Sequence, residues 1–579
     1  MIENNYILEP NNMEIVFRRK GTLTRRKLRE YIPVMILTNM SVFLLSTVDG
    51  LVAGNMVSGK ALAAINIFFP AMVIISVISV LVASGCATSM ATCMGRNDVE
   101  AIRRTKKAAK IVMISAAAFT AIVQFPIMYA VIHSYDLTPE VSEMAWAYSA
   151  GIMVAMPLGL ISSVGSYQLQ IAGKMRVLMV LSLVEGILNT LLDLMFAGAM
   201  HMGIAGIGLG TASAAFVRCV ITVVYMIKKT DIFRCQGAKA GRAEIKDVLY
   251  CGCPDAANML MLAFQNYFVM WVILSEFGDV GGVIKGVCFF AFNVANIVIL
   301  GLMGSMRPLA GLLAGAGDTK AMRILMRQCI SVTVVLVGII SIVVEIFPAL
   351  FYRLNGVTDI PDGGILSLRL FALYFIFAGI NSLLRLYFAN RKDSAAATGL
   401  TLIGNATLPF FAFAFGHFLS SPFLWLGFLT TELLIFAVGE CRYVWWLKRD
   451  QKVLDPEEKV LYLSVKPEEA IEASRMIRRF AEEEGCSSRI AYRMALCMEE
   501  MVAYVVQSQK ESGIEIMIMA RFRPNEGIFC MIDDGECIAL NENKETEKLI
   551  TDNYELIKKI AKSVEYQYVL NMNYTTIRF

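Results

Sequence analysis

Acidic and amide side chains lie inside long apolar stretches of this sequence, an environment that disfavours charge. Asp49 falls in the first such stretch, and Glu185, Asn189 and Asp193 fall together in the fifth. The last three are spaced i, i+4, i+8, so they share one face of a helix. A carboxylate deep in a membrane-spanning helix costs about 2.5–3.5 kcal/mol on insertion scales, which makes such residues candidates for a functional site.

The chemistry that these groups could perform is cation binding. If the first and fifth helices are neighbours, Asp49, Asn189 and Asp193 would form an oxygen-rich pocket. Carboxylate and amide oxygens can hold a proton or coordinate a hard cation such as Na⁺. We therefore predict a cation-coupling site from these three residues. The structural alternative is that Asp49 lies near a membrane boundary and Asp193 caps a helix end.

Three further charged residues are accessory candidates. Glu185 belongs to the same stripe as Asn189, and Glu432 is the acidic residue of the C-terminal half that could lie deep in the membrane. A structural ion pair or solvation at a helix end would explain Glu432 equally well. Arg218 could neutralise an acidic partner or extend toward the membrane surface.

The elements that must position these residues are membrane helices. The chain has 579 residues, of which 56% are hydrophobic and 18% charged, with a mean hydropathy of +0.58. A helix needs about 20 mainly apolar residues to cross a bilayer. Twelve stretches meet this condition, at 31–53, 62–94, 108–132, 144–170, 176–199, 204–227, 250–275, 283–312, 328–352, 365–390, 395–418 and 422–447.

The loops between these stretches predict the topology. Lys and Arg collect before the first stretch, between the second and third, and after the sixth, whereas the alternate loops contain few. Such basic loops face the cytoplasm. Both termini are therefore predicted to be cytoplasmic, which agrees with an even number of spans. The small net charge of +4 carries no nucleic-acid signature.

The membrane part contains an internal repeat. Gly85 through Arg103 has a counterpart at Gly304 through Arg323, offset by 219 to 220 residues, and three other short matches fall in similar register. Duplicated halves of this kind are common in transporters. We predict a basic N-terminal segment, 1–30, two six-helix lobes, 31–229 and 247–447, and a linker, 230–246. A substrate path is expected between the lobes.

A water-soluble tail follows the membrane part. Of the 53 Lys and Arg and the 49 Asp and Glu, 43 lie in the last 132 residues. After a linker at 448–459, the segment 460–579 alternates strand and helix patterns. We predict strands at 460–465, 514–522, 527–533, 565–570 and 574–579 and helices at 467–484, 487–509 and 552–563, which make a small α+β domain.

The membrane part resembles the multidrug and toxic compound extrusion (MATE) transporters. The residues that carry the resemblance are Ile32-Pro-Val-Met, Val48-Asp49-Gly50, Ala61-Leu-Ala-Ala64, Pro70, Gly186-Ile-Leu-Asn189-Thr-Leu-Leu-Asp193, Gly203-Ile-Ala-Gly-Ile-Gly-Leu-Gly210 and Gly304 with Pro308-Leu-Ala-Gly311. The resemblance implies a V-shaped, all-α membrane protein of twelve helices in two lobes. It also implies an antiporter that exports organic, cationic or amphipathic compounds in exchange for H⁺ or Na⁺.

The resemblance also suggests where coupling occurs. In the bacterial branch with a cation site in the N-terminal lobe, the matching positions are Asp49, Asn189 and Asp193, and the seventh stretch has no acid at Met259–Gln265. We expect a monomer in the cytoplasmic (inner) membrane of a bacterium, with a small organic substrate, the bilayer as surroundings and no required cofactor or structural metal. Secondary transport is not enzymatic chemistry.

The tail resembles the GHKL-type ATPase domain of anti-sigma-factor serine kinases. The phrases that carry this resemblance are Ala495-Leu-Cys-Met-Glu-Glu500, Met531-Ile-Asp-Asp-Gly535 and Ile557-Lys-Lys-Ile-Ala. Glu500, Asp533 and Gly535 match the family's base and adenine-reading positions. Tyr504 replaces the expected Asn, and a Gly expected near Tyr554 is missing. We therefore expect a degenerate domain that binds a regulatory protein, or a nucleotide poorly, without kinase activity.

Two other functions fit the same architecture. A lipid-precursor flippase would require a larger and more basic central cavity. A membrane sensor would use the transporter-like part to detect a compound and the tail to signal through a partner.

Overall fold

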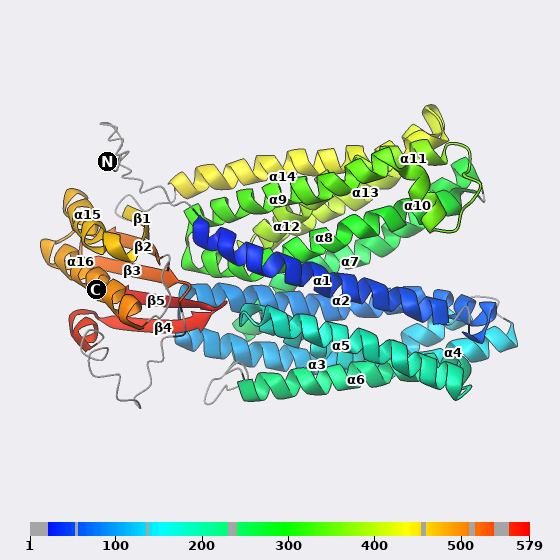
Figure 1. Cartoon of the computed structure of the whole chain (residues 1–579), viewed down its shortest axis with the longest axis horizontal. Coiled ribbons are helices and arrows are strands. Elements are labelled where there is room, and N and C mark those ends of the chain that lie inside the picture. The colour runs from blue at the N-terminus through cyan, green and yellow to red at the C-terminus, as the bar shows by residue number, and fades with distance from the viewer. Residues whose placement is uncertain are drawn as a thin grey trace.

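The computed structural model describes residues 21–52, 56–134, 138–229, 240–278, 280–452, 459–508, 514, 516–535, 537 and 555–579. Long helices run side by side along the molecule, and a small domain of strands and helices, from residue 459 onward, lies at one end of them (Figure 1). We call this small domain the tail domain, and the end of the bundle beside it the tail-side end. The prediction of a helical membrane part followed by a small α+β domain is confirmed at this level.

The bundle consists of fourteen α-helices within the described residues. They are α1 (Thr22–Val52), α2 (Gly59–Arg96), α3 (Val99–His133), α4 (Pro139–Ile171), α5 (Met175–Asp193), α6 (Gly203–Lys229), α7 (Arg242–Phe277), α8 (Val280–Ala316), α9 (Thr319–Ile346), α10 (Pro348–Leu354), α11 (Gly364–Ala372), α12 (Phe375–Asn390), α13 (Ser394–Phe418) and α14 (Leu426–Lys452).

Eleven segments among the described residues are long and apolar enough to cross a membrane. They cover the second to twelfth predicted stretches. The first predicted stretch, 31–53, falls on α1, a helix of 31 residues whose side chains are described only in part. Since α1 is not among the eleven, the count of twelve spans stays a prediction.

Three predicted spans are interrupted. The fifth changes from α-helix to a π-helix, η2 (Leu194–Ala199). The ninth is divided between α9 and α10 at Pro348, because proline has no N–H to continue the helical hydrogen bonds. The tenth is divided into α11 and α12. Local backbone chemistry, which hydropathy does not report, causes the Pro348 break.

The bundle has two halves, α1–α6 and α7–α14, coloured blue to teal and green to yellow in Figure 1. Helix α2 packs against α7 and α8, and α1 packs against α8. We call this contact the seam. Two crossings in it are made by glycines: Gly85 of α2 meets Gly252 of α7, and Gly95 of α2 meets Gly315 of α8. Without side chains, the helix backbones approach closely at both points.

The tail domain contains a five-stranded antiparallel sheet. Its strands are β1 (Lys459–Val465), β2 (Ile516–Arg523), β3 (Glu526–Asp533), β4 (Ser563–Val569) and β5 (Met572–Arg578), in the order β1-β2-β3-β5-β4. Helices α15 (Ala470–Glu483) and α16 (Ser488–Ser508) belong to the same domain. All five predicted strands and the first two predicted helices are present. The third predicted helix is described only over residues 555–560.

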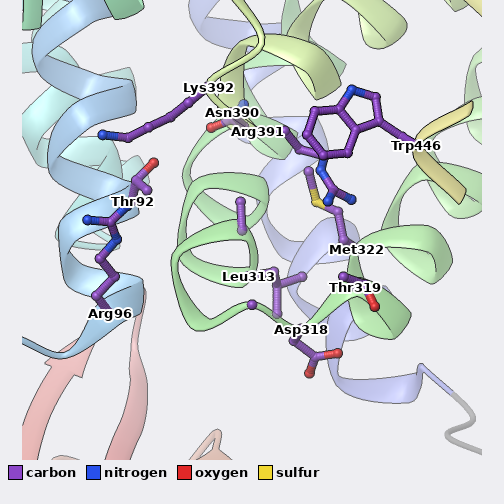
Figure 2. A pocket seen from close by; sticks show the side chains of 12 residues that line it. Thr92, Arg96, Leu313, Asp318, Thr319, Met322, Asn390, Arg391, Lys392 and Trp446 are labelled. Carbon is purple, nitrogen blue, oxygen red and sulfur yellow. The ribbon is translucent and has the colours of Figure 1, made fainter. Parts of the chain in front are cut away.

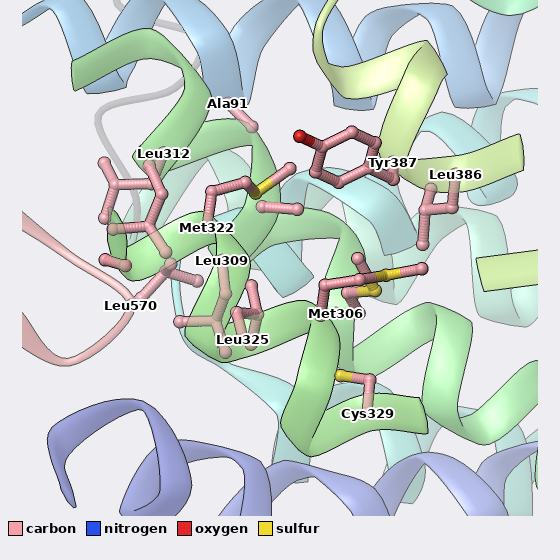
Figure 3. Packing of buried hydrophobic residues seen from close by; sticks show 14 of the residues in the cluster. Ala91, Met306, Leu309, Leu312, Met322, Leu325, Cys329, Leu386, Tyr387 and Leu570 are labelled. Carbon is pink, nitrogen blue, oxygen red and sulfur yellow. The ribbon is translucent and has the colours of Figure 1, made fainter. Parts of the chain in front are cut away.

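Both faces of this sheet are apolar and buried. Along β2, Ile516, Ile518 and Phe522 pack with residues of α15 and α16. The alternate residues Met517 and Met519 belong instead to a cluster shared with the bundle. Because successive side chains of a strand point to opposite faces, the tail domain packs its helices on one face and the bundle on the other. Figure 3 shows Leu570 of the tail domain within that shared cluster.

Candidate functional site

The polar stripe predicted on the fifth span lies inside the first half. Asn189 and Asp193 of α5 are 2% and 0% exposed, and Asn189 Nδ2 donates a hydrogen bond of 3.1 Å to Asp193 Oδ2. Helix α6 contributes Gly210 beside them. A Cβ atom at Gly210 would lie 3.3 Å from Asp193 Cγ and would overlap the carboxylate oxygen Oδ1. The carboxylate therefore occupies space that only a glycine on α6 leaves open.

The backbone changes at the same place. The α-helix α5 ends at Asp193, and the π-helix η2 begins at Leu194. Wide π-turns inside helices are rare and often occur at functional sites, since they alter the direction of neighbouring side chains. Asp193 thus lies where α5 passes into the π-helix and is also buried beside Asn189.

For Asp49 the structure describes the helix but not the side chain. Asp49 belongs to α1, and its side chain lies outside the described residues. Helices α1 and α5 pack against each other, which is the condition on which the predicted pocket depended. The joint site of Asp49, Asn189 and Asp193 stays a prediction.

Glu185 and Arg218 form an ion pair between α5 and α6. The guanidinium of Arg218 contacts the Glu185 carboxylate through Nη1 and donates from Nη2 to Ser166 Oγ of α4 at 3.1 Å. Each charged side chain is 16% exposed. Of the two roles considered for Arg218, neutralising an acidic partner is the one that the structure has. This pair ties three helices of the first half together, one turn from Asn189.

Glu432 of the second half joins two helices. Asn381 of α12 donates from Nδ2 to Glu432 Oε2 at 2.6 Å and to the Glu432 backbone carbonyl at 2.8 Å, and Asn381 is buried. Glu432 lies on α14. These hydrogen bonds link α12 to α14, and a role of Glu432 in cation coupling stays a prediction.

An ion pair between α7 and α8, beside the seam, was missed by the sequence reasoning; its arginine is buried and its aspartate side chain is 29% exposed. Arg307 of α8 is 5% exposed, and its Nη2 lies 2.8 Å from Oδ2 of Asp255 on α7. The guanidinium carbon also lies 5.5 Å from the ring centroid of Tyr167 on α4 of the first half. The available signal was an arginine inside the eighth apolar stretch, 283–312, together with an aspartate near the start of the seventh.

This pair marks the tail-side part of the seam. Asp255 follows the Gly252 crossing by three residues, and Arg307 precedes the Gly315 crossing by eight, which corresponds to about 12 Å along a helix. A buried arginine whose carboxylate partner is removed carries a large desolvation cost. The pair therefore favours the arrangement in which α7 and α8 face Tyr167 of the first half.

A cavity of about 230 Å³ lies at the tail-side end, between the end of α2 and the turns that follow α8 and α12. Figure 2 shows Arg96 and Lys392 on one side and Arg391 with Trp446 on the other. Lys392 Nζ is bound to Asp247 Oδ1 at 2.6 Å, and the Arg391 guanidinium lies 4.3 Å from the Trp446 ring centroid. This basic cavity differs in character from an apolar substrate path.

The tail residues predicted to bind a nucleotide are Glu500, Asp533 and Gly535, and the structure describes contacts between the last two. Asp533 Oδ1 accepts hydrogen bonds from Asn573 Nδ2 at 2.6 Å and from the Gly535 backbone N–H at 3.0 Å. Burial raises the pKa of Asp533 to about 6, although these two hydrogen bonds oppose the shift. Glu500 is half-buried on α16. Most of the predicted loop at 534–551 lies outside the described residues, so nucleotide binding stays a prediction.

Comparisons with known proteins point to one family. The MatE family model matches residues 35–195. The multidrug export protein MepA of Staphylococcus aureus (strain NCTC 8325 / PS 47) is 18% identical over 332 residues, covering 57% of this chain and 72% of MepA. MepA of Staphylococcus haemolyticus (strain JCSC1435) is 23% identical over 155 residues, covering 26% of this chain and 33% of that protein.

Solved structures share the fold. An outward-facing multidrug resistance MATE family transporter of the MOP superfamily superposes with a TM-score of 0.69 at 18% identity, covering 74% of this chain and 96% of that chain. A MOP superfamily transporter from Pyrococcus furiosus gives 0.69 at 17% identity, with the same coverage. The membrane part of this chain is therefore similar in sequence to MATE family transporters, over the residues 35–195 that the family model matches, and it shares their fold.

Proposed function

We propose that the protein is a cation-coupled antiporter that exports organic, cationic or amphipathic compounds across a bacterial cytoplasmic membrane. The observation that carries this proposal is the buried Asn189–Asp193 pair, placed against Gly210 and on a helix that packs beside α1. A buried acid beside an amide oxygen can bind H⁺ or Na⁺. MepA, a relative by sequence, is named as a multidrug export protein, which agrees with an organic substrate.

The proposed cycle is a competition between cation and substrate. Loading a cation at Asp193, with Asp49 as its predicted partner, removes the cost of a buried negative charge and lets α1 repack against α5. That repacking favours one access state and releases the substrate, whereas loss of the cation restores the other state. Only a difference in cation affinity between the two states can drive the cycle.

The topology completes the proposal. We infer twelve spans, counting α1, with both termini and the tail-side end in the cytoplasm, because the basic loops collect on that side. The tail domain would then be a cytoplasmic regulatory domain, degenerate in its resemblance to GHKL ATPases. No coupling ion is assigned in advance.

A second function, a compound sensor, is favoured by one observation. The tail domain shares a buried apolar cluster with the bundle, so it is positioned to respond to movement of the helices. A sensor would change its tail contacts when a compound binds but would move no compound across the membrane.

The deciding experiment is dye transport by the purified full-length protein in liposomes. An ethidium-like dye is loaded, and efflux is measured under a proton gradient alone and then under a sodium gradient alone. The export proposal predicts efflux under at least one gradient, and loss of that efflux in both Asp49→Asn and Asp193→Asn at normal expression. Near-normal pumping by both variants would overturn the site, and absence of flux under every gradient would favour the sensor.

A further inference from the structure

The sheet face of the tail domain that looks toward the bundle is an interaction surface, and both halves of the membrane part occupy it. We call this face the docking face. Its apolar residues, all at most 4% exposed, are Met517, Met519, Ile532, Met572 and Tyr574. They belong to the same buried cluster as Leu309, Leu312 and Leu313 of α8 and Leu23 of α1. Exposure of such a face would be costly, since burial of apolar surface stabilises by about 25 cal/mol per Å².

The docking face is hydrogen-bonded to the end of α2 in the first half. Tyr574 on β5 donates its hydroxyl to the Gly95 carbonyl at 2.8 Å. Asn97, whose left-handed backbone ends α2, donates from Nδ2 to Thr576 Oγ1 at 3.0 Å and to the Glu565 carbonyl at 2.9 Å. These bonds fix two strands of the sheet to the last turn of α2.

The turn between β4 and β5 adds further contacts with the first half. Tyr31 of α1 donates its hydroxyl to the Leu570 carbonyl at 2.6 Å, and Lys27 Nζ donates to the Asn571 carbonyl at 2.9 Å. Asn571 Nδ2 in turn donates to the Gly173 carbonyl, between α4 and α5, at 3.1 Å. Two separate segments of the first half, α1 and the turn between α4 and α5, therefore contact this one turn.

The second half contacts the sheet at the end of α8 and the start of α9. Arg521 on β2 donates from its guanidinium to the Ala316 carbonyl at the end of α8. The next residue, Gly317, has a φ of +71°, and a Cβ atom there would overlap that guanidinium. Lys320, in the first turn of α9, lies 5.5 Å from the ring centroid of Tyr462 on β1.

These two sets of contacts meet at the Gly95–Gly315 crossing of the seam. Tyr574 binds the carbonyl of Gly95, and Arg521 binds the carbonyl next to Gly315, the glycine that faces Gly95 across the seam. Strands β5 and β2 are separated only by β3, so their spacing is about 10 Å. A hydrogen-bonded sheet does not stretch, and it therefore holds the ends of α2 and α8 at this spacing.

We propose that the docked tail domain is a lock on the tail-side end of the seam. The two halves part there only after the sheet has released one of them. Alternating access by rocking of two repeats requires such parting on one side of the membrane. The lock therefore regulates the transport proposed above, on which its functional meaning rests. In this proposal the second half is the one released, through Arg521 and Lys320.

The test uses the full-length protein in nanodiscs with Thr92→Cys as a reporter of opening. Thr92 lies on α2, is buried, and has its carbonyl against Gly315 in the seam. Its modification by a membrane-impermeant maleimide is followed by peptide mass spectrometry, which separates it from native cysteines. The lock is weakened by Arg521→Ala with Lys320→Ala. Arg475→Ala, an exposed arginine of α15, serves as the matched control.

The lock predicts about tenfold faster modification of Cys at position 92 in the weakened variant, which corresponds to about 1.4 kcal/mol of lost docking free energy. The control should match the parent. In liposomes, the rate of dye efflux by the weakened variant should be higher than that of the parent. Modification within twofold of the parent, with unchanged efflux, would overturn the lock.

Two additional measurements keep this result interpretable. Hydrogen exchange across β2 and β3 reports whether the tail domain remains folded. If the double substitution unfolds it, Tyr574→Phe, which removes one hydroxyl contact with Gly95, replaces it: faster modification supports the lock, and an unchanged rate contradicts it. If the parent pumps no dye under any gradient, the export proposal fails, and the modification rates alone decide the lock.

Discussion

Gly95 and Gly315 contact each other across the seam in a reciprocal way. A Cβ atom on either glycine would lie 2.8 Å from the Cα of the other. The overlaps that each Cβ would make are also equivalent: that of Gly95 with the Leu312 carbonyl, and that of Gly315 with the Thr92 carbonyl. Both pairs are separated by the 220-residue offset of the sequence repeat. The repeat-related positions thus meet at a local twofold arrangement.

Gly315→Ala should loosen this crossing. The added methyl overlaps a backbone carbonyl, which cannot rotate away, and overpacking of this kind costs about 1–3 kcal/mol. We expect the thermal unfolding midpoint of the purified protein to fall by several degrees. Gly399→Ala is the matched control, since a Cβ on that helical glycine has no neighbour within 4 Å. Equal midpoints for the two variants would contradict a tight crossing.

Gly210→Ala should impair the proposed cation site while the acidic residue Asp193 itself is left unsubstituted. The new methyl overlaps Asp193 Oδ1, so the carboxylate must leave its place beside Asn189. We expect gradient-driven dye efflux to fall at least about tenfold, the effect of about 1.4 kcal/mol. Efflux is measured in liposomes beside Gly399→Ala. If Gly210→Ala pumps like the parent, Asp193 does not require its observed position.

The Arg307–Asp255 pair should show strong energetic coupling. Asp255→Asn leaves the buried Arg307 guanidinium unpaired, at a cost of about 3–5 kcal/mol. Arg307→Met leaves Asp255 unpaired at a smaller cost, because that side chain is 29% exposed, and removing both restores neutrality. Arg307→Met and Asp255→Asn are therefore each expected to destabilise the protein more than the double substitution does. The measurement is a double-mutant cycle of unfolding in detergent.

A second pair provides the comparison for this cycle. Arg369 and Glu345 lie 3.9 Å apart, with side chains 49% and 34% exposed. Exposed pairs of this kind contribute at most about 1 kcal/mol. A coupling energy at Arg307–Asp255 no larger than at Arg369–Glu345 would show that the seam pair is not energetically important.

Asp533 should make the tail domain less stable as the pH rises. Its folded pKa, about 6, exceeds the ordinary value of 3.8, so the folded state holds the proton more tightly than the unfolded state. The stabilisation is complete below about pH 4 and is lost as the pH rises through 6. From pH 5 to 7.5 the loss is about 1.4 kcal/mol, estimated from one unit of pKa.

Hydrogen exchange of β3 and β5 in the full-length protein, corrected for intrinsic rates, measures this effect. Asp533→Asn keeps a carbonyl oxygen at the position that accepts from Asn573 and Gly535, and it should abolish the pH dependence. Glu526→Gln, at an exposed residue of β3, should retain it. A pH slope that persists in Asp533→Asn would assign the effect to another group.

The sequence by itself determined the helical membrane part, the positions of the five strands along the tail and the stripe at Asn189 and Asp193. These features depend on hydropathy and on helical or strand periodicity, which are local properties. The run Ile516–Ala520 on β2 is apolar on both faces, which is typical of a strand buried on two sides.

Only the tertiary structure decided which faces meet. It paired Arg218 with Glu185, placed Arg307 against Asp255, and seated the tail domain on both halves. Periodicity shows that a helix or strand has a polar or apolar face, but not which distant segment covers that face. Contacts separated by hundreds of residues, such as Tyr574 with Gly95, follow from the packing of whole elements and have no local signature.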